Sequence, residues 1–421
     1  MMITGHAAFF RRAHDLCLPL LGLIAQAGFA ALLAVWGHGA FIAQAATDAT
    51  ATAEKDKQEL YRSSLSPDPC HFFVKAKLRD EDVALIVDTG ARRALTFEES
   101  VAKTLGPALN PVQVNREVQG AVYKIPEVRI GHLVLPESER SAIDLSSMRF
   151  VTGMPVLGVV GWESLKGRTL VIDNDAHSLE IREGKAGLSH PQLSLPVEVE
   201  EPLGLPQVRA KVGDSEIPFV IDTGDNGCVG LSKAEFERLE AEGYIQTFNE
   251  GEKQVSVGGI RSAKSGMFTR GTIWGVDLKG LPVASNASDV CAVGLVFLLK
   301  LNYSISNSPS VFSCSVRANP EPPVQLPRMA GAFIVYRDGH AVIAKIKKGG
   351  PADNAGLAER DEIKSIDEFG DKPLNLSNLY EVCRKQAGKS LTLHLSNQGS
   401  PKVVRLELPA APSAWEGKAP E

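Results

Sequence analysis

The sequence predicts a mainly β protein that consists of two similar halves and a smaller C-terminal unit. Three observations lead to this prediction. The tripeptide Asp-Thr-Gly occurs twice, at 88–90 and 222–224, each time directly after a strand-like apolar run. Short β-prone segments alternate with glycine-containing turns, and helix-like stretches are few. The order of segments around the first triplet recurs around the second, which indicates an internal duplication.

The composition is that of an ordinary globular protein. The chain has 421 residues, of which 44% are hydrophobic and 23% are charged, and a net charge of −5. This length is typical of roughly two to four compact units. Because the chain has neither a basic block nor a basic–aromatic stripe, nucleic acid is not an expected partner.

Residues 1–45 read as an export signal or a membrane anchor rather than as part of the globule. Arg11 and Arg12 precede an apolar stretch at 16–36, and Ala43-Gln-Ala45 offers a small-residue cleavage site. The apolar stretch is longer than a usual signal core, so a retained membrane anchor stays open beside the favoured cleaved signal. The sequence therefore predicts an exported protein, periplasmic or extracellular, with membrane association if the segment is retained.

Export would permit disulfide bonds. Cys17 lies in the apolar stretch, and residues 46–69 are expected to be a linker. Among the other five cysteines, either Cys291 or Cys70 could bridge to Cys314. The alternative is that these cysteines are small buried apolar side chains.

Each half is expected to begin with two strands, the second of which leads into the triplet. Alternation of apolar and polar residues predicts the first strand at 73–78 in one half and at 207–212 in the other. After a short turn, the apolar runs 85–87 and 219–221 lead directly into the triplets.

Short helices follow, at 97–105 and 232–242, with Thr96 and Ser232 as the expected N-caps. The remaining elements of each half are a glycine-containing hairpin, an apolar-Gly unit with a short helix, and a closing strand. In chain order these lie at 118–123, 159–165 and 169–173, and again at 255–260, 292–298 and 301–305.

With these elements in place, each half resembles a lobe of a retropepsin-like aspartic protease, and the fused pair resembles a single-chain pepsin-type enzyme. The resemblance covers roughly residues 70 to 316. It rests on the two triplets and on Val160-Gly161 and Val293-Gly294, which match the second element of each lobe's core. It implies two acid-protease-like β-barrel lobes, at 70–190 and 196–318.

Asp88 and Asp222 are the expected catalytic residues. Two carboxyl groups that share a proton can activate water against a peptide bond without a metal or a covalent intermediate. We therefore expect no cofactor and no metal, and peptides or proteins as substrates. The alternative for each triplet is an Asp-x-Gly turn without chemistry, which explains one triplet better than two.

By the resemblance, the hydroxyls of Thr89 and Thr223 brace the two loops beneath the carboxyl groups. Gly90 and Gly224 allow close backbone approach, because a Cβ would obstruct it.

The residues after the triplets are expected to tune the pKa of the dyad. Pepsin-like enzymes usually have Ser or Thr there, whereas this chain has Ala91 and Asp225. A lost hydroxyl and an added carboxylate both oppose ionisation. The sequence therefore predicts activity at milder pH than that of a gastric enzyme.

The hairpin glycines Gly120, Gly258 and Gly259 mark candidate flaps over the substrate. Tyr123 is the candidate flap aromatic, and the alternative is that it packs in the core.

The C-terminal unit follows a Pro-rich linker at 319–327. Residues 328–409 resemble a bacterial, protease-associated PDZ domain, and residues 410–421 would be a tail. The match rests on the run Gly350-Pro-Ala-Asp-Asn-Ala-Gly-Leu357. It implies binding of C-terminal peptide ligands by strand addition, with Gly331, Ala332 and Phe333 in the carboxylate-binding loop. The alternative is a unit that packs on the protease and binds no peptide.

The favoured interpretation is an exported aspartic endopeptidase whose PDZ domain recruits substrates or regulates access. One alternative is a catalytically silent, protease-derived peptide-binding protein, which Asp225 favours. A second is a set of lobes that act only as a dimer, which two triplets in one chain make unnecessary.

Overall fold

The computed structural model divides the chain into two units, Met1–Glu54 and Lys55–Glu421, and only the second is described below. The described residues are 59–66, 71–114, 118–200, 204–256, 259–286, 289–320, 330–337, 340–370, 372–397 and 399–410. The predicted signal or anchor, most of the Pro-rich linker and most of the tail lie outside them. Among the described residues, no helix is long and apolar enough to cross a membrane.

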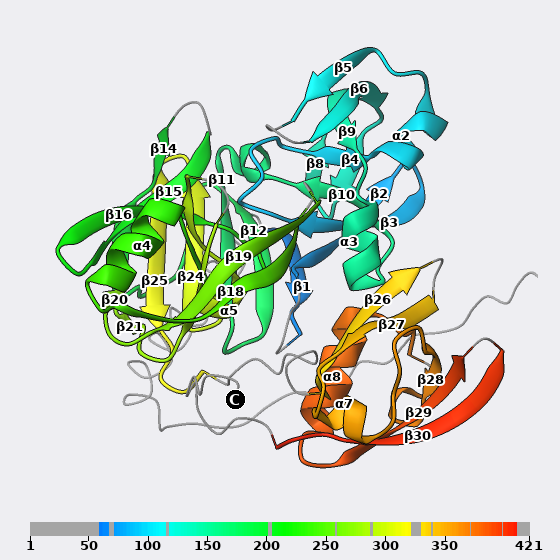
Figure 1. The fold of residues 1–421 in the computed structure, drawn as a ribbon. Coiled ribbons are helices and arrows are strands. Elements are labelled where there is room, and N and C mark those ends of the chain that lie inside the picture. The colour runs from blue at the N-terminus through cyan, green and yellow to red at the C-terminus, as the bar shows by residue number, and fades with distance from the viewer. Residues whose placement is uncertain are drawn as a thin grey trace, which may run out of the picture. The chain divides into compact units, whose positions relative to one another are not determined.

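The protein is mainly β, as predicted, and its described residues form five sheets (Figure 1). Contrary to the expectation of barrel lobes, none of these sheets is closed into a barrel. The largest sheet has nine strands, and within the described residues its two outermost strands do not pair with each other. Its order is β5 (Asn110–Gln113), β6 (Gln119–Ile125), β9 (Ser138–Ile143), β4 (Thr96–Glu98), β10 (Val156–Val160), β3 (Glu81–Val87), β2 (Phe73–Leu78), β7 (Val128–Ile130) and β8 (Leu133–Leu135).

Four strands of this sheet place the first triplet. β2 and β3 pair antiparallel, β10 lies parallel to β3, and β4 pairs antiparallel with β10. The side chains of β3 are buried from Leu85 to Val87, so the strand runs through the interior and ends at Asp88.

The second half repeats these pairings in an eight-stranded sheet. β15 and β16 pair antiparallel, β23 lies parallel to β16, and β17 pairs antiparallel with β23. The recurrence of the pairing pattern supports the predicted duplication. The strand order is β14 (Glu198–Glu200), β15 (Leu205–Val212), β16 (Ser215–Ile221), β23 (Cys291–Val293), β17 (Val229–Leu231), β22 (Pro282–Ser285), β19 (Gly259–Phe268) and β18 (Ile245–Ser256).

One of the two predicted N-caps is correct. Ser232 caps α4 (Lys233–Ala241), and its hydroxyl accepts from the Glu235 amide at 3.2 Å. Thr96 does not cap α2 (Glu99–Leu105), because it lies in strand β4 and Glu98 is the N-cap instead.

A six-stranded sheet takes strands from both halves, and Figure 1 shows teal β11 beside yellow β24. The order is β1 (Glu59–Ser64), β12 (Ser178–Glu183), β11 (Arg168–Asp173), β24 (Leu301–Asn307), β25 (Ser310–Val316) and β13 (Leu193–Pro196). β1 lies in the stretch that we expected to be a linker, and its pairing with β12 corrects that expectation. One hydrophobic core includes buried side chains from both halves.

The C-terminal unit has its own core and a five-stranded sheet. Its strands follow the chain order, so β26 and β30 are the outer strands. Its elements are β26 (Ala332–Arg337), β27 (His340–Ile346), α7 (Pro351–Asn354), β28 (Glu362–Ile366), η2 (Asp367–Phe369), α8 (Leu376–Lys385), β29 (Ser390–Asn397) and β30 (Ser400–Glu407).

The remaining elements are short. They are α3 (Ser146–Thr152), η1 (Trp162–Leu165), β20 (Thr272–Ile273), β21 (Val276–Asp277) and α5 (Leu295–Leu298). Helices η1 and α5 begin directly after Gly161 and Gly294, at the positions that the sequence predicts.

The described cysteines are buried, and Cys291 and Cys314 are free thiols. Since both of these thiols are free, neither of the two bridges considered from the sequence is formed.

Candidate active site

The two triplets lie at the ends of β3 and β16, and the apolar-Gly strands hold them there. The amide of Asp88 donates to the Val160 carbonyl at 2.9 Å, and the amide of Asp222 donates to the Val293 carbonyl at 3.0 Å. The same backbone bond therefore fixes each Asp against the parallel strand beside it.

The two loops are joined by hydrogen bonds between their threonines. The Thr223 hydroxyl donates to the Val87 carbonyl at 2.8 Å and accepts from the Thr89 amide at 3.0 Å. In return, the Thr89 hydroxyl accepts from the Thr223 amide at 3.2 Å and donates to the Ile221 carbonyl. Both threonines are buried, so these bonds operate without competing water and tie one half to the other.

Removal of one of these hydroxyls should destabilise the protein. In Thr223→Val, the Thr89 amide and the Val87 carbonyl lose a partner in the interior, and each such loss costs about 1–3 kcal/mol. We expect the free energy of unfolding to fall by about 3 kcal/mol, as measured by urea denaturation. Thr272→Val, at an exposed position, is the matched control and should change it by less than about 0.5 kcal/mol.

The two glycines bring each backbone against the opposite carboxyl group. A Cβ added to Gly90 would lie 2.4 Å from the Asp222 Cγ, and one added to Gly224 would lie 2.3 Å from the Asp88 Cγ. Only residues without a Cβ allow this arrangement, so the triplet glycines are required by the approach of the two aspartates.

The environment favours one shared proton in the pair. Burial raises the pKa of Asp222 well above its usual value, and the charges of Asp88 and Asp225 raise it further. Burial also raises the pKa of Asp88, but a hydrogen bond from Asp222 and the amides of Gly90 and Ala91 oppose that rise. The pair therefore tends to keep one shared proton, and the rise in pKa is larger at Asp222.

Asp225 extends the carboxyl cluster. Its Oδ1 accepts from the Gly227 amide at 2.8 Å, and its own amide donates to Asp222 Oδ1 at 3.1 Å. A Cβ at Gly294 would lie 3.0 Å from the Asp225 Cγ. The third carboxyl group is thus held between the second triplet and the apolar-Gly element, where its negative charge opposes ionisation of both catalytic candidates.

Ala91 occupies the corresponding place in the first half. Its amide donates to the Asp88 carbonyl at 3.1 Å, and its own carbonyl accepts from the Trp162 amide at 2.8 Å. With a methyl side chain it contributes only backbone interactions to the dyad, so the two halves differ at this position.

His71 is a buried residue beside the second triplet that was not predicted from the sequence. This side chain is 7% exposed, and a hydrogen bond joins it to the backbone of Gly224 in the other half. Burial lowers its pKa to about 4, so it is neutral at neutral pH. No local motif marks this residue, because the contact that distinguishes it lies in the opposite triplet.

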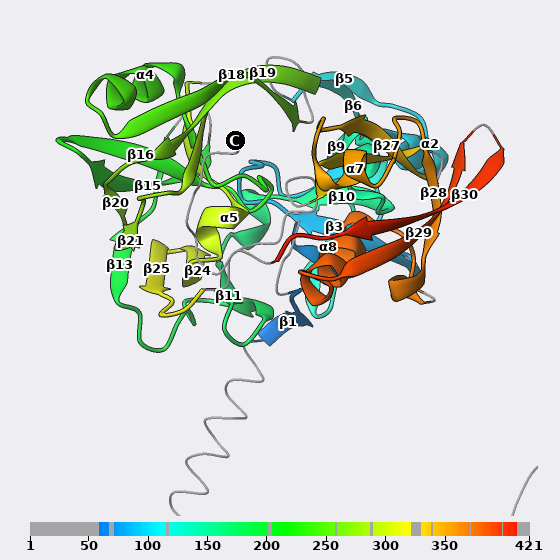
Figure 2. The same cartoon turned by 60° about the horizontal axis from the view of Figure 1, so that its bottom comes forward.

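The flap candidates differ in their placement. Tyr123 is 2% exposed and belongs to the shared core, the second of the two roles considered for it. Gly120 lies in β6, where a Cβ would meet the Ala142 carbonyl at 2.1 Å. Gly258 is outside the described residues, and Gly259 begins β19, which pairs with β18 in a long hairpin (Figure 2).

The candidate peptide-binding residues lie at the start of the outer strand β26. Gly331 has a φ of +68°, and its carbonyl accepts from the Lys347 amide at 2.7 Å. Ala332 is buried, whereas Phe333 is exposed. The structure therefore places these three residues together at the beginning of an edge strand.

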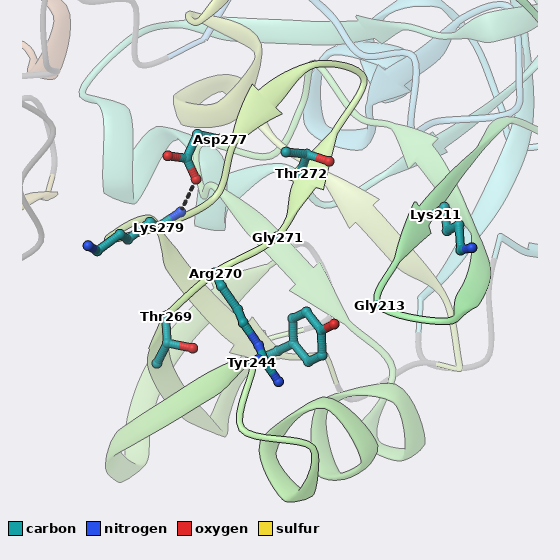
Figure 3. Close-up of a pocket in the computed structure, with 9 residues that line it drawn as sticks. All are labelled: Lys211, Gly213, Tyr244, Thr269, Arg270, Gly271, Thr272, Asp277 and Lys279. Atoms are coloured by element: carbon teal, nitrogen blue, oxygen red, sulfur yellow. Dashed lines mark hydrogen bonds between the residues drawn. The ribbon is translucent and has the colours of Figure 1, made fainter.

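A cavity of about 680 Å³ lies elsewhere in the second half (Figure 3). Basic side chains dominate its charged lining, namely Lys211, Arg270 and Lys279, with Asp277 as the acidic one. Arg270 lies over the ring of Tyr244, 4.3 Å from its centroid. Because this cavity shares no residue with either triplet, it does not bear on the carboxyl pair.

No group of three or more His, Cys, Asp or Glu side chains that could hold a metal ion occurs within the described part of the chain. In comparisons with known proteins, no family model matches this sequence and no curated protein is significantly similar to it.

Proposed function

We propose that this chain is an aspartic endopeptidase that hydrolyses peptide bonds with the pair Asp88 and Asp222. The observation that carries the proposal is the reciprocal threonine bonding, which joins two duplicated Asp-Thr-Gly loops so that their carboxyl groups meet. Two isolated turns would require neither these bonds nor glycines packed against the opposite carboxyl group.

We assign the two roles by the larger rise in the pKa of Asp222. Asp88 Oδ1 is buried and has no hydrogen-bond partner among the described residues, so as the ionised group it can accept a proton from an attacking water. Asp222, which holds the shared proton, donates a hydrogen bond to the scissile carbonyl. The tetrahedral intermediate collapses when a proton passes to the leaving amine.

The same proposal includes the assignment of two protease lobes and a PDZ domain. Two lobes at 70–190 and 196–318 explain the repeated strand pairings. A PDZ domain at 328–409 explains an edge strand and a helix that share a separate core. We also propose export, on the basis of the N-terminal sequence alone.

The second candidate is a catalytically silent peptide-binding protein. Asp225 favours it, because a third buried carboxyl group opposes ionisation of the pair. The two candidates differ in one result, which is whether the intact protein cleaves peptides.

The test is cleavage of a mixed peptide library by residues 46–421 over a pH series, with products identified by mass spectrometry. The proposal expects cleavage that is insensitive to chelators and optimal at milder pH than the ordinary carboxyl pKa. An optimum below about pH 3.5 would contradict the tuning by Asp225. If no peptide is cleaved at any pH, the silent candidate replaces the enzyme.

Asp225→Asn should shift the pH–rate profile to lower pH. The negative charge of Asp225 raises the pKa of both Asp88 and Asp222, so its removal lowers both values. Both limbs of the profile of kcat/KM should therefore move in the acid direction. Asp214→Asn, at an exposed turn, should leave the profile in place. A shift toward alkaline pH in Asp225→Asn would contradict the assignment.

A further inference from the structure

The outer strand β26 is suited to bind an extended peptide. It pairs with β27 on one side only, and no strand of the described residues pairs with its other side. Such an edge presents backbone N–H and C=O groups to an added strand. The helix α8 packs in the same core as β26, and an edge strand beside a helix is the arrangement that strand-addition modules use.

In this chain, the helix α3 of the first half contacts this surface. It touches both β26 and α8. Val151 packs against the C-terminal core, and the Arg337 guanidinium lies 5.6 Å from the centroid of the Phe150 ring. A Cβ on Gly153 would lie 2.5 Å from the Tyr336 ring. Tyr336 and Arg337, at the end of β26, thus contact Gly153, the C-cap of α3, and Phe150 within the helix.

Consistent with this contact, the middle of β26 is covered. Val335 is 1% exposed and Tyr336 is 6% exposed, although both lie in an outer strand. Figure 1 shows α3 directly next to β26.

The helix α3 is anchored to the first half rather than to the C-terminal unit. Glu98, which is buried, accepts from the Leu145 amide at 2.7 Å and forms an ion pair with Arg149 at 2.9 Å. Leu145, directly before α3, and Arg149, the fourth residue of the helix, are therefore fixed by charge-assisted bonds to Glu98. The contact of α3 with β26 instead includes the Phe150 ring, which lies near Arg337. The contact of α3 with β26 is therefore the one that an incoming peptide can replace.

We infer that α3 is an intramolecular cover for the peptide-binding site of the C-terminal unit. A peptide that adds to β26, with its terminal carboxylate at the Gly331 loop, displaces α3, so docking of α3 and binding of the peptide exclude each other. This inference rests on the proposed peptide-binding function of that unit. The covered state lowers the apparent affinity for peptide by the fraction of molecules in which the site is free.

The helix α3 is connected through the chain to the candidate active site. After Gly153 the chain enters β10, and the Val160 carbonyl at the end of β10 accepts from the Asp88 amide. The helix also contacts β18 of the long hairpin in the second half. The helix α3 is therefore linked both to the peptide site and to two strands of the two halves, β10 and β18.

The experiment measures peptide binding to the full chain that carries Asp88→Asn, so that cleavage of the probe does not interfere. The probe is a fluorescein-labelled decapeptide with three apolar residues at a free C-terminus, followed by fluorescence anisotropy. Val151→Asp introduces a carboxylate into the contact and leaves β26 and α8 intact. We expect it to bind the probe at least tenfold more tightly than the Asp88→Asn parent.

The matched control is Ser146→Asp, at the exposed first residue of the same helix, which should bind like the parent. Phe150→Ala removes the contact with Arg337 without adding a charge, and it should tighten binding by about threefold, a weaker effect in the same direction. It replaces Val151→Asp if circular dichroism shows that the latter is unfolded. An amidated probe should bind at least tenfold more weakly to each variant, because it lacks the carboxylate.

Equal affinities of the parent, Val151→Asp and Phe150→Ala would overturn the inference, as would a complete lack of probe binding to every variant. Equal binding of the free and amidated probes would overturn its chain-end part. Since all these proteins carry Asp88→Asn, the outcome does not depend on catalysis. Failure here leaves the endopeptidase proposal untouched, and loss of the endopeptidase proposal leaves this result interpretable.

Discussion

Replacement of either catalytic candidate, Asp88→Asn or Asp222→Asn, is expected to reduce kcat by about 10³-fold or more while KM stays within about threefold. The amide is nearly isosteric, so substrate contacts persist, but it cannot accept the proton of the attacking water or share one with its partner. Positioned acid–base groups contribute about 10²–10⁴-fold to such reactions. Library cleavage with purified variants gives the measurement.

Of these two substitutions, Asp222→Asn should also stabilise the protein at neutral pH. Because burial raises the pKa of Asp222 in the folded state, that carboxyl group contributes stability below its ordinary pKa of 3.8, and the contribution is lost as pH rises through the raised value. An Asn side chain does not ionise, so the variant does not lose this stability as pH rises. Its Oδ1 can still accept from the amides of Gly224 and Asp225. We expect Asp222→Asn to melt about 3 °C or more above the parent at pH 7.

The melting difference should shrink toward zero as pH falls below 3.8, where the parent carboxyl group becomes protonated in both states. A variant that is inactive and also much less stable at pH 7 would indicate a structural role for Asp222 instead of a catalytic one.

The second large effect is expected at Gly90. In Gly90→Ala the new methyl would lie 2.4 Å from the Asp222 Cγ, so either the carboxyl group or the first loop must move. A displacement of about 1 Å in a reacting group can cost 10²-fold in rate, and we expect kcat to fall by at least that factor. The Asp222 carboxyl group itself remains present, so the loss would come from geometry alone.

Gly106→Ala is the matched control, since nothing lies within 4 Å of its Cβ position. It should retain the parent rate and melting temperature. Full activity of Gly90→Ala would show that the two carboxyl groups do not need their present separation, which would contradict the shared-proton mechanism.

The parts that local patterns specify could be predicted from the sequence. The apolar runs before Asp88 and Asp222 identified the buried strands that deliver the carboxyl groups, and Ser232 identified the start of α4. The pairing of the two loops followed from the duplication. That the threonines bond reciprocally was expected only by resemblance, and the distances now support it.

What could not be predicted depends on residues far apart in the chain. Thr96 is a good helix cap locally, but strand β4 continues through it to Glu98, whose carboxylate is bound by Leu145 and Arg149. Strand β1 has no apolar run of its own, and its pairing with β12 makes it a strand. The sequence also contains no signal for sheet closure, since that depends on whether the outer strands come within hydrogen-bond distance.

The sheet that takes strands from both halves has a consequence for the origin of such a chain. A half on its own would leave the edge of β11 and one side of the shared core uncovered, and a second copy would cover them. Fusion makes that encounter intramolecular and independent of concentration. Fusion also allows the two halves to differ in sequence. A symmetric pair must carry the same residue twice, whereas this chain holds Ala91 on one side and Asp225 on the other, so the carboxyl groups of Asp88 and Asp222 have different surroundings.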